Sequence, residues 1–324
     1  MLKQLFLFVL LIPLIVSCSN NLDITPCNKA EPEAQEIASF YLKIDSINEK
    51  YSTSNGIYVS RGYISNYTVD SAADAVGSFV CSKLFSWAGA SVGAVCGNPV
   101  VAVGGYLVGR KIGTYAGAAA ASIGSAWFRD KWGSRSSSPH NLALNENYVV
   151  PINDPNNLSD GELHNLIVSK LLKNIDKYIT IDGDLNYDIL IEDALQYEKE
   201  LCPDEEYTDE YKALWLPKAV EQTKRIVNSS SLLINDNSND FLNDVYNNLI
   251  PEIKITKEEF DNANILNEKT LSTYMVLDEG NILDYSKDID TIIDNSNLNP
   301  ELKTDLKSSN SILLNSTLIW REVK

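Results

Sequence analysis

Small residues recur at every fourth position in the segment GGYLVGRKIGTYAGAAAASIGSAW, which spans residues 104–127. The ladder consists of Gly105, Gly109, Gly113 and Gly117, and it continues at Ala121 and Ser125. Because residues four apart share one face of an α-helix, the pattern predicts a helix with one face that carries only small side chains, called the bare face below. Each glycine inside a helix costs roughly 0.8–1 kcal/mol relative to alanine, so repeated glycines indicate a close approach of another backbone.

A second ladder of the same spacing precedes the first. It consists of Gly89, Gly93 and Gly97. We expect its helix to begin at Asp70 or Ser71 and to end near Cys96, where Gly97-Asn98-Pro99 follows as a helix breaker. The sequence therefore predicts an antiparallel helical hairpin over about residues 70–128, with the two bare faces packed on each other.

Three locations for this hairpin fit the sequence: against the rest of the protein, in a membrane, or between copies of the chain. Lys83, Arg110 and Lys111 would lie at one level, roughly 20 Å from the turn at Asn98. Since a bilayer core is about 30 Å thick, these bases would stop the tip short of crossing it. The opposite face of the second arm is polar enough to predict partial solvent exposure. It comprises Leu107, Lys111, Thr114, Ala118 and Ser122.

The first 17 residues are typical of an export signal, with Lys3 followed by an apolar run too short to span a bilayer. The run ends in Ile15-Val16-Ser17-Cys18, which resembles the lipobox of bacterial lipoproteins. We therefore expect Cys18 to carry acyl chains such as palmitate, which hold the protein on a lipid bilayer. The predicted location is the bacterial envelope, with the outer membrane favoured and the facing side open. An ordinary signal peptide that ends before a cysteine is the alternative.

Charge divides the remainder of the chain. Residues 19–133 carry nine basic and nine acidic side chains, whereas residues 134–324 carry 17 basic and 35 acidic ones, a net charge of −18. A field of that sign repels phosphate backbones, which argues against nucleic acid as a partner. An unidentified protein partner stays open.

The apolar pattern is helical on both sides of a polar linker, so the predicted fold class is all-α. We expect a lipidated tether at residues 18–30, an N-terminal helix and the hairpin at 31–133, the linker at 134–158 and an acidic helical bundle at 159–324. Helix starts are marked by a capping box at Ser159 and Glu162 and by Asn299-Pro300-Glu301. Pro217 should kink or end its helix.

Four cysteines follow Cys18 in the chain: Cys27, Cys81, Cys96 and Cys202. In an exported protein they allow two disulfides in any of three pairings, among which the sequence does not choose. Residues 81 and 96 would lie about 22 Å apart on one continuous helix, which makes that pairing poor. The cysteines lack CxxC spacing, so no structural zinc site is expected.

The chain has two histidines. His140 lies in the linker, where we expect it to be solvated. His164 lies in the first turn of a predicted helix, where Glu162 is a candidate partner for acid–base chemistry. A buried, hydrogen-bonded histidine at a helix start is the favoured interpretation.

Side chains with oxygen alternate along residues 182–188 in a pattern that resembles a calcium loop. The candidate ligands are Asp182, Asp184, Asn186, Asp188 and Asp193. Tyr187 stands where an EF-hand needs glycine, and Asp193 stands where it needs glutamate. A polar turn capped by Asn186 or Asp184 is favoured, so neither a metal nor another cofactor is expected.

Three segments together suggest a family: the stretch from ADAVGSFV to GAAAASIGSAW, the helix start Gly161-Glu-Leu-His164-Asn165, and a last helix that reads SSNSILLNSTLIW. This combination resembles a group of uncharacterised exported bacterial lipoproteins of the Bacteroidetes type. The similarity covers roughly residues 70–321 and implies a glycine-rich hairpin before an all-helical body, without implying an activity. The ladder alone is similar to outer-membrane glycine-zipper lipoproteins and to class II bacteriocins.

The sequence thus favours a membrane-anchored envelope lipoprotein with a binding or structural role and no enzymatic activity. The first alternative is a membrane-active or toxin-like protein that inserts its glycine-rich hairpin. The second alternative is an enzyme that uses His164 and Glu162.

Overall fold

The protein is all-α over the residues that the computed structural model describes. These are residues 30–54, 73, 77, 80, 113–132, 144–149, 158–202, 209–230, 232, 238–251, 253 and 255–320. Within them the only β-type pairing is an isolated antiparallel bridge between Ile179 and Leu185.

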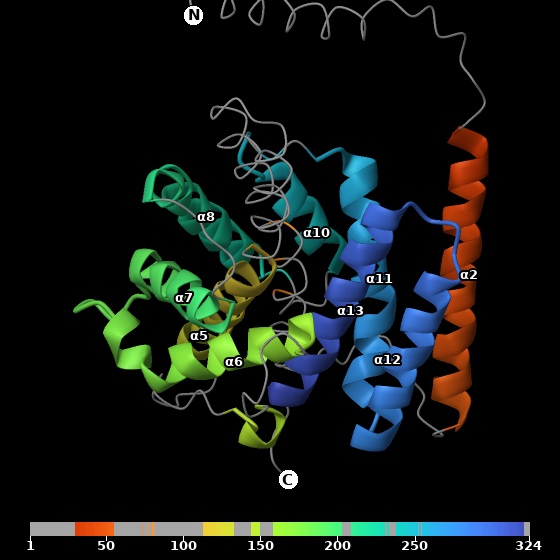
Figure 1. The fold of residues 1–324 in the computed structure, drawn as a ribbon, viewed down its shortest axis with the longest axis horizontal. Helices are drawn as coiled ribbons and strands as arrows, with labels where there is room; N and C mark the ends of the chain where they lie inside the picture. Colours follow the sequence, from red (N-terminus) through yellow and green to blue (C-terminus); the bar gives the residue numbers. More distant parts are fainter. Residues whose placement is uncertain are drawn as a thin grey trace, which may run out of the picture.

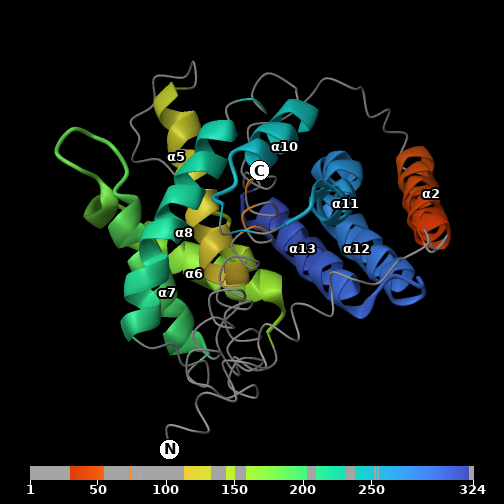
Figure 2. The ribbon, with the colours of Figure 1, turned by 90° about the horizontal axis from the view of Figure 1, so that it is seen from above.

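The described residues form nine α-helices, with α13 in the middle of the arrangement (Figures 1 and 2). They are α2 (Ala30–Ser54), α5 (Ala118–Trp132), α6 (Asp160–Lys173), α7 (Tyr187–Leu201), α8 (Asp209–Ser229), α10 (Ser238–Asn247), α11 (Lys257–Val276), α12 (Glu279–Asp294) and α13 (Pro300–Ile319). A π-helical turn, η1 (Gly113–Gly117), leads into α5, and short 3₁₀ turns occupy Glu146–Tyr148 and Ile175–Tyr178. Helix α13 packs on α6 on one side and on α11 and α12 on the other.

Local sequence explains where several helices begin. The Ser159 hydroxyl accepts a hydrogen bond from the Glu162 backbone N–H, and the Glu162 carboxylate accepts one from the Ser159 backbone N–H, which confirms the predicted capping box of α6. Asn299 caps α13 and Pro300 occupies its first turn, as predicted. Asn186 caps α7, which confirms the polar-turn interpretation of that segment.

The part of α5 whose side chains are described is buried on all sides, and every side chain from Thr114 to Trp127 is inaccessible to solvent or nearly so. The predicted partial exposure of the face that carries Thr114, Ala118 and Ser122 is therefore wrong. The reason is that α6, α7 and α8 all contact α5, so no side of it is left for water. Ser122 accepts a hydrogen bond from the buried Trp320 indole N–H at 2.9 Å, which explains how a polar residue is tolerated there.

Two glycines show how closely other elements approach this segment. A Cβ added at Gly77, from the predicted first arm, would lie 2.7 Å from Ala121 Cβ and 3.4 Å from the Gly117 carbonyl oxygen. A Cβ at Gly124 would lie 2.6 Å from Val227 Cγ2 on α8. Part of the small-residue ladder thus contacts the first arm, and another small residue contacts the helical bundle.

Most of the predicted hairpin lies outside the described residues. This applies to the ladder members Gly89, Gly93, Gly97, Gly105 and Gly109, to the turn, and to the bases Lys83, Arg110 and Lys111. It applies equally to Cys18, Cys27, Cys81, Cys96 and His140. Cys202 is described, is partly buried and follows the last turn of α7.

Two hydrophobic clusters hold the helices together. The α5 cluster takes in α5, α6, α7, α8, α10 and the first half of α11, together with Ile319 and Trp320 at the end of α13. The α12 cluster takes in α2, α12 and parts of α11 and α13, with Phe40, Ile44 and Tyr51 on α2. Residues before and after the predicted 134–158 linker therefore share both clusters, so the linker does not divide the core into two separate ones.

Pro217 lies inside α8, which continues past it to Ser229. Of the two predicted outcomes, a kink or the end of the helix, the end is therefore excluded. Both Ala213 and Pro217 are exposed, so the Ala213 carbonyl that loses its helical partner lies on the side of the helix that faces water.

Candidate binding groove between α6, α12 and α13

The Gly161–Asn165 segment forms the crossing of α6 over α13. The Gly161 backbone N–H donates to Ser311 Oγ at 3.0 Å. A Cβ at position 161 would lie only 2.1 Å from the Ser311 carbonyl oxygen and 2.4 Å from Asn315 Nδ2. Only glycine fits at this contact, because any larger side chain would force the two helices apart.

Asn165 ties three segments together inside the protein. Its Nδ2 group donates to the Tyr148 carbonyl at 3.2 Å and to the Asn315 carbonyl at 3.1 Å. Its Oδ1 atom lies 3.1 Å from His164 Nδ1, so this ring nitrogen carries the proton and donates. The predicted G-x-x-H-N helix start thus connects α6 to α13 and to the turn at Glu146–Tyr148 through hydrogen bonds.

His164 is fully buried, and burial lowers the pKa of its imidazole to about 4 even though the bond to Asn165 acts in the opposite direction. The ring is therefore neutral at neutral pH. The Glu162 carboxylate accepts a hydrogen bond from the Ser159 backbone at 2.7 Å instead of approaching the ring. Side chains two apart in a helix point in different directions, so the structure does not bring the proposed acid–base pair together.

The residues of the predicted calcium loop make separate structural contacts and do not converge on one point. Asp193 accepts hydrogen bonds from the Tyr178 hydroxyl at 2.8 Å and from Lys177 Nζ at 2.6 Å. Asn186 is used as the cap of α7, and Asp188 lies 3.9 Å from Lys224 Nζ. In the described ranges, Asp182 and Asp184 included, no group of three or more His, Cys, Asp or Glu side chains is arranged to hold a metal ion.

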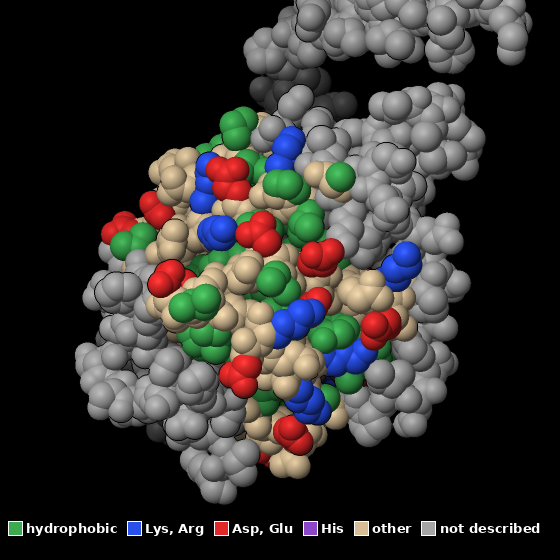
Figure 3. Space-filling model, turned by 90° about the vertical axis from the view of Figure 1, so that its left-hand side faces the viewer, with side chains coloured by type: hydrophobic (Ala, Val, Ile, Leu, Met, Phe, Trp, Pro, Cys, Tyr) green, Lys and Arg blue, Asp and Glu red, His purple; other side chains and the backbone are tan. Residues whose placement is uncertain are grey.

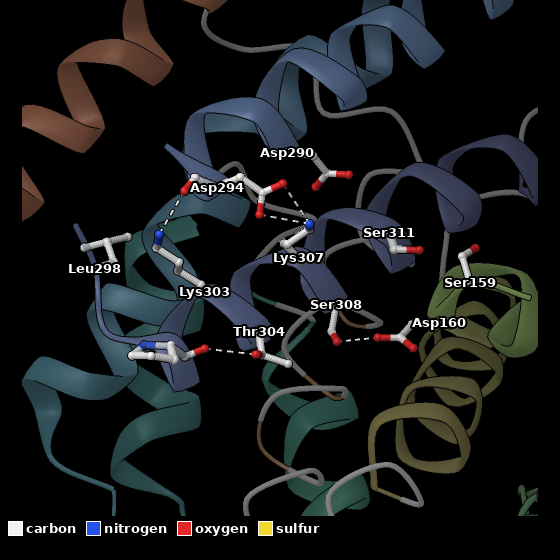
Figure 4. A pocket seen from close by; sticks show the side chains of 11 residues that line it. Ser159, Asp160, Asp290, Asp294, Leu298, Lys303, Thr304, Lys307, Ser308 and Ser311 are labelled. Atoms are coloured by element: carbon white, nitrogen blue, oxygen red, sulfur yellow. Dashed lines mark hydrogen bonds and ion pairs between the residues drawn. The ribbon is translucent and has the colours of Figure 1, made fainter. Parts of the chain in front are cut away.

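A groove of about 510 Å³ opens where the start of α6 meets the end of α12 and the first three turns of α13 (Figure 4). Its apolar end is formed by Leu298 and Pro300. Its polar lining consists of Ser159, Asp160, Asp290, Asp294, Lys303, Thr304, Lys307, Ser308 and Ser311. The groove therefore combines acidic, basic and hydroxyl groups in one concave surface.

Both lysines of the groove are directed at Asp294, the last residue of α12. Lys307 Nζ lies 3.0 Å from each oxygen of the Asp294 carboxylate, and Lys303 Nζ donates to its main-chain carbonyl at 2.9 Å (Figure 4). Positive charges at the end of α12 also complement the helix dipole. Each ammonium group has three donors, so both lysines retain capacity for a further acceptor.

The other two acids of the groove have different partners. Asp160 accepts hydrogen bonds from the Tyr115 hydroxyl at 2.8 Å and from the Ser308 hydroxyl. Asp290 accepts one from Asn310 Nδ2 at 2.9 Å, the one hydrogen bond that its carboxylate makes to the described residues. Burial raises the pKa of Asp290, while the Asn310 bond and the Lys307 charge lower it in part.

This groove was not predicted from the sequence. A usable signal was present, because the short connection of residues 295–299 makes α12 and α13 antiparallel neighbours. Asp290 and Asp294 then face Lys303 and Lys307 with the same four-residue spacing. The contribution of Ser159 and Asp160 depends on the α6–α13 crossing, for which no local signal exists.

On one face of the described surface the acidic side chains are dispersed among basic ones. Figure 3 shows the face that includes α7 and α8, where Asp and Glu side chains alternate with Lys and Arg. Among the described residues, no helix is both long enough and apolar enough to cross a membrane. No protein-family model matches this chain, and neither a curated protein nor a solved structure does.

Proposed function

We propose that the chain is an exported lipoprotein, anchored to a membrane of the bacterial envelope through Cys18, whose helical body acts by binding and not by catalysis. The observation that carries the proposal is the sequence Ile15-Val16-Ser17-Cys18 directly after an apolar run of export-signal length. The short polar tether before α2 is consistent with a body held close to the bilayer.

The described residues support binding over the two alternatives. His164, on which an enzymatic role would depend, is buried, neutral and hydrogen-bonded to Asn165. Insertion of the glycine-rich hairpin would remove the buried α5 from a cluster that it shares with α6, α7 and α8. The groove between α6, α12 and α13, in contrast, offers open polar groups without any rearrangement of the fold.

The test is incorporation of an alkyne-labelled fatty acid into the full chain produced with its own leader in a bacterium. We expect the label to appear on the native chain and on the Cys27→Ser variant, and to be absent from Cys18→Ser. Cys27→Ser is the matched control because it removes a cysteine nine residues further along. Mass spectrometry of the N-terminal peptide should locate the lipid on Cys18. Label that persists in Cys18→Ser, or an unlabelled native chain, would contradict the proposal.

A further inference from the structure

Asp290 is the acid of the groove with the fewest hydrogen bonds to the described residues. The Asp294 carboxylate is neutralised by Lys307, and Asp160 is held by two hydroxyl groups. Among the described residues, the neutral amide of Asn310 is the one hydrogen-bond donor to Asp290, and the Lys307 charge acts on Asp290 without a direct contact. A half-buried carboxylate in that position gains most from a positively charged group that enters the groove, because such a pair forms in a partly dehydrated site.

Asp290 is also fixed in place. Asn310 Nδ2 donates to Asp290, to the Ser286 carbonyl and to Ser286 Oγ, while its Oδ1 accepts from the buried Tyr274 hydroxyl. This network runs from the groove into the α12 cluster. It holds the carboxylate without the entropy loss that a mobile surface acid would suffer on binding.

The lysines of the groove can bind a negatively charged group of a ligand. Lys303 Nζ makes its hydrogen bond to a main-chain carbonyl, so no carboxylate of the described residues cancels its positive charge by direct contact. Thr304 and Ser311 add hydroxyl groups to the same lining of the groove. A ligand that reaches Lys303 therefore needs an acceptor, and a negative one is favoured.

We infer that this groove binds a small zwitterion of the amino-acid class, with its ammonium group on Asp290 and its carboxylate on Lys303 and Lys307. The inference rests on the proposed binding role and names its ligand class. A zwitterion complements both charges at once, whereas a neutral sugar would leave the Asp290 charge without a counter-ion. Leu298 and Pro300 at the apolar end provide contact area for an aliphatic side chain.

The test is calorimetric titration of the full chain, purified in detergent, with a mixture of the common L-amino acids and then with each one alone. Methylamine, acetate and D-glucose are the comparison probes. We expect saturable binding of at least one amino acid, and binding weaker by about tenfold or more in Asp290→Asn, since a hydrogen bond between charged groups is lost. Asp284→Asn is the matched control, because it makes the same change on the exposed side of α12.

A second variant guards against a folding defect in Asp290→Asn. Thr304 is exposed, and its hydroxyl donates to the Pro300 carbonyl of its own helix, so Thr304→Tyr should fill the groove without disturbing the core. We expect it to abolish binding while the circular dichroism spectrum stays unchanged.

Several results would overturn the inference. They are the absence of binding by any amino acid up to about 10 mM, equal affinity in Asp290→Asn, binding of methylamine or acetate as tight as that of the amino acid, or binding of glucose alone. The fatty-acid labelling at Cys18 is independent of the groove. Lipid attachment without amino-acid binding would therefore overturn this inference and leave the anchored location intact.

Discussion

His164 is a side chain whose charge is set by its surroundings. Its pKa of about 4 in the folded protein lies below the value of 6.5 expected for an unperturbed histidine. Between these two values the unfolded chain takes up a proton that the folded protein does not, so the free energy of unfolding falls as the pH is lowered. At about 1.4 kcal/mol per pH unit, the loss amounts to about 3 kcal/mol near pH 4.

This dependence predicts how a variant should behave. Urea unfolding of the native chain and of His164→Gln should give a stability difference that is largest above pH 6.5 and shrinks by about 3 kcal/mol as the pH approaches 4. The carboxylates contribute equally to both proteins and cancel in the difference. His140→Gln, at the other histidine of the chain, should leave the profile unchanged. Identical pH profiles for the native chain and His164→Gln would show that the ring is not buried in its neutral form.

At the scale of the helices, the close crossing of α6 over α13 depends on the absence of a side chain at Gly161. In Gly161→Ala the new Cβ would meet the Ser311 carbonyl oxygen at 2.1 Å, a backbone atom that cannot rotate away. We expect a loss of about 1–3 kcal/mol or more in the free energy of unfolding. The same variant should shift α6 along α13 and so weaken the Asn165 contacts to Tyr148 and Asn315.

Gly280→Ala is the control for this crossing. Gly280 lies in the first turn of α12, and an added Cβ there would come no closer than 3.6 Å to another atom, Asp278 Oδ1. Since alanine is the better helix former, this variant should be as stable as the native chain or more stable by up to about 1 kcal/mol. Equal stability of Gly161→Ala and Gly280→Ala in urea unfolding would contradict the close crossing.

Local sequence predicts where several helices begin, but it does not predict which helices pack on one another. The starts of α6, α7 and α13 follow from caps whose partners lie within three residues, at Ser159, Asn186 and Asn299, so the sequence is sufficient there. The burial of Thr114 and Ser122 depends on contacts with helices that begin at Asp160 or later, and polarity alone therefore suggested the wrong environment. The groove was missed for the same reason, because its walls come from α6, α12 and α13.

In the molecule as a whole, both hydrophobic clusters include residues of α13. Leu306, Leu313 and Leu318 belong to the α12 cluster, whereas Ile319 and Trp320 belong to the α5 cluster. Helix α11 is divided in the same way, with Phe260 in one cluster and Tyr274 in the other. Two clusters that share helices cannot lose one of them without exposing part of the other, so we expect the body to unfold as one cooperative unit.

Asn310→Ala tests this cooperativity from the centre of α13. The change removes the hydrogen bond from the buried Tyr274 hydroxyl to Asn310 and the hydrogen bond from Asn310 to Asp290, which should cost about 1–3 kcal/mol. If the body is one unit, native-state hydrogen exchange should show the same loss of protection in the slowest amides of α5 and α6 as in those of α2 and α12. Lys50→Met is the control, because it removes exposed contacts of Lys50 with Asp288 and with the Tyr51 ring and should change protection much less than Asn310→Ala does. Loss of protection confined to α2 and α12 would instead define two separately unfolding parts, and would leave the α5 cluster stable on its own.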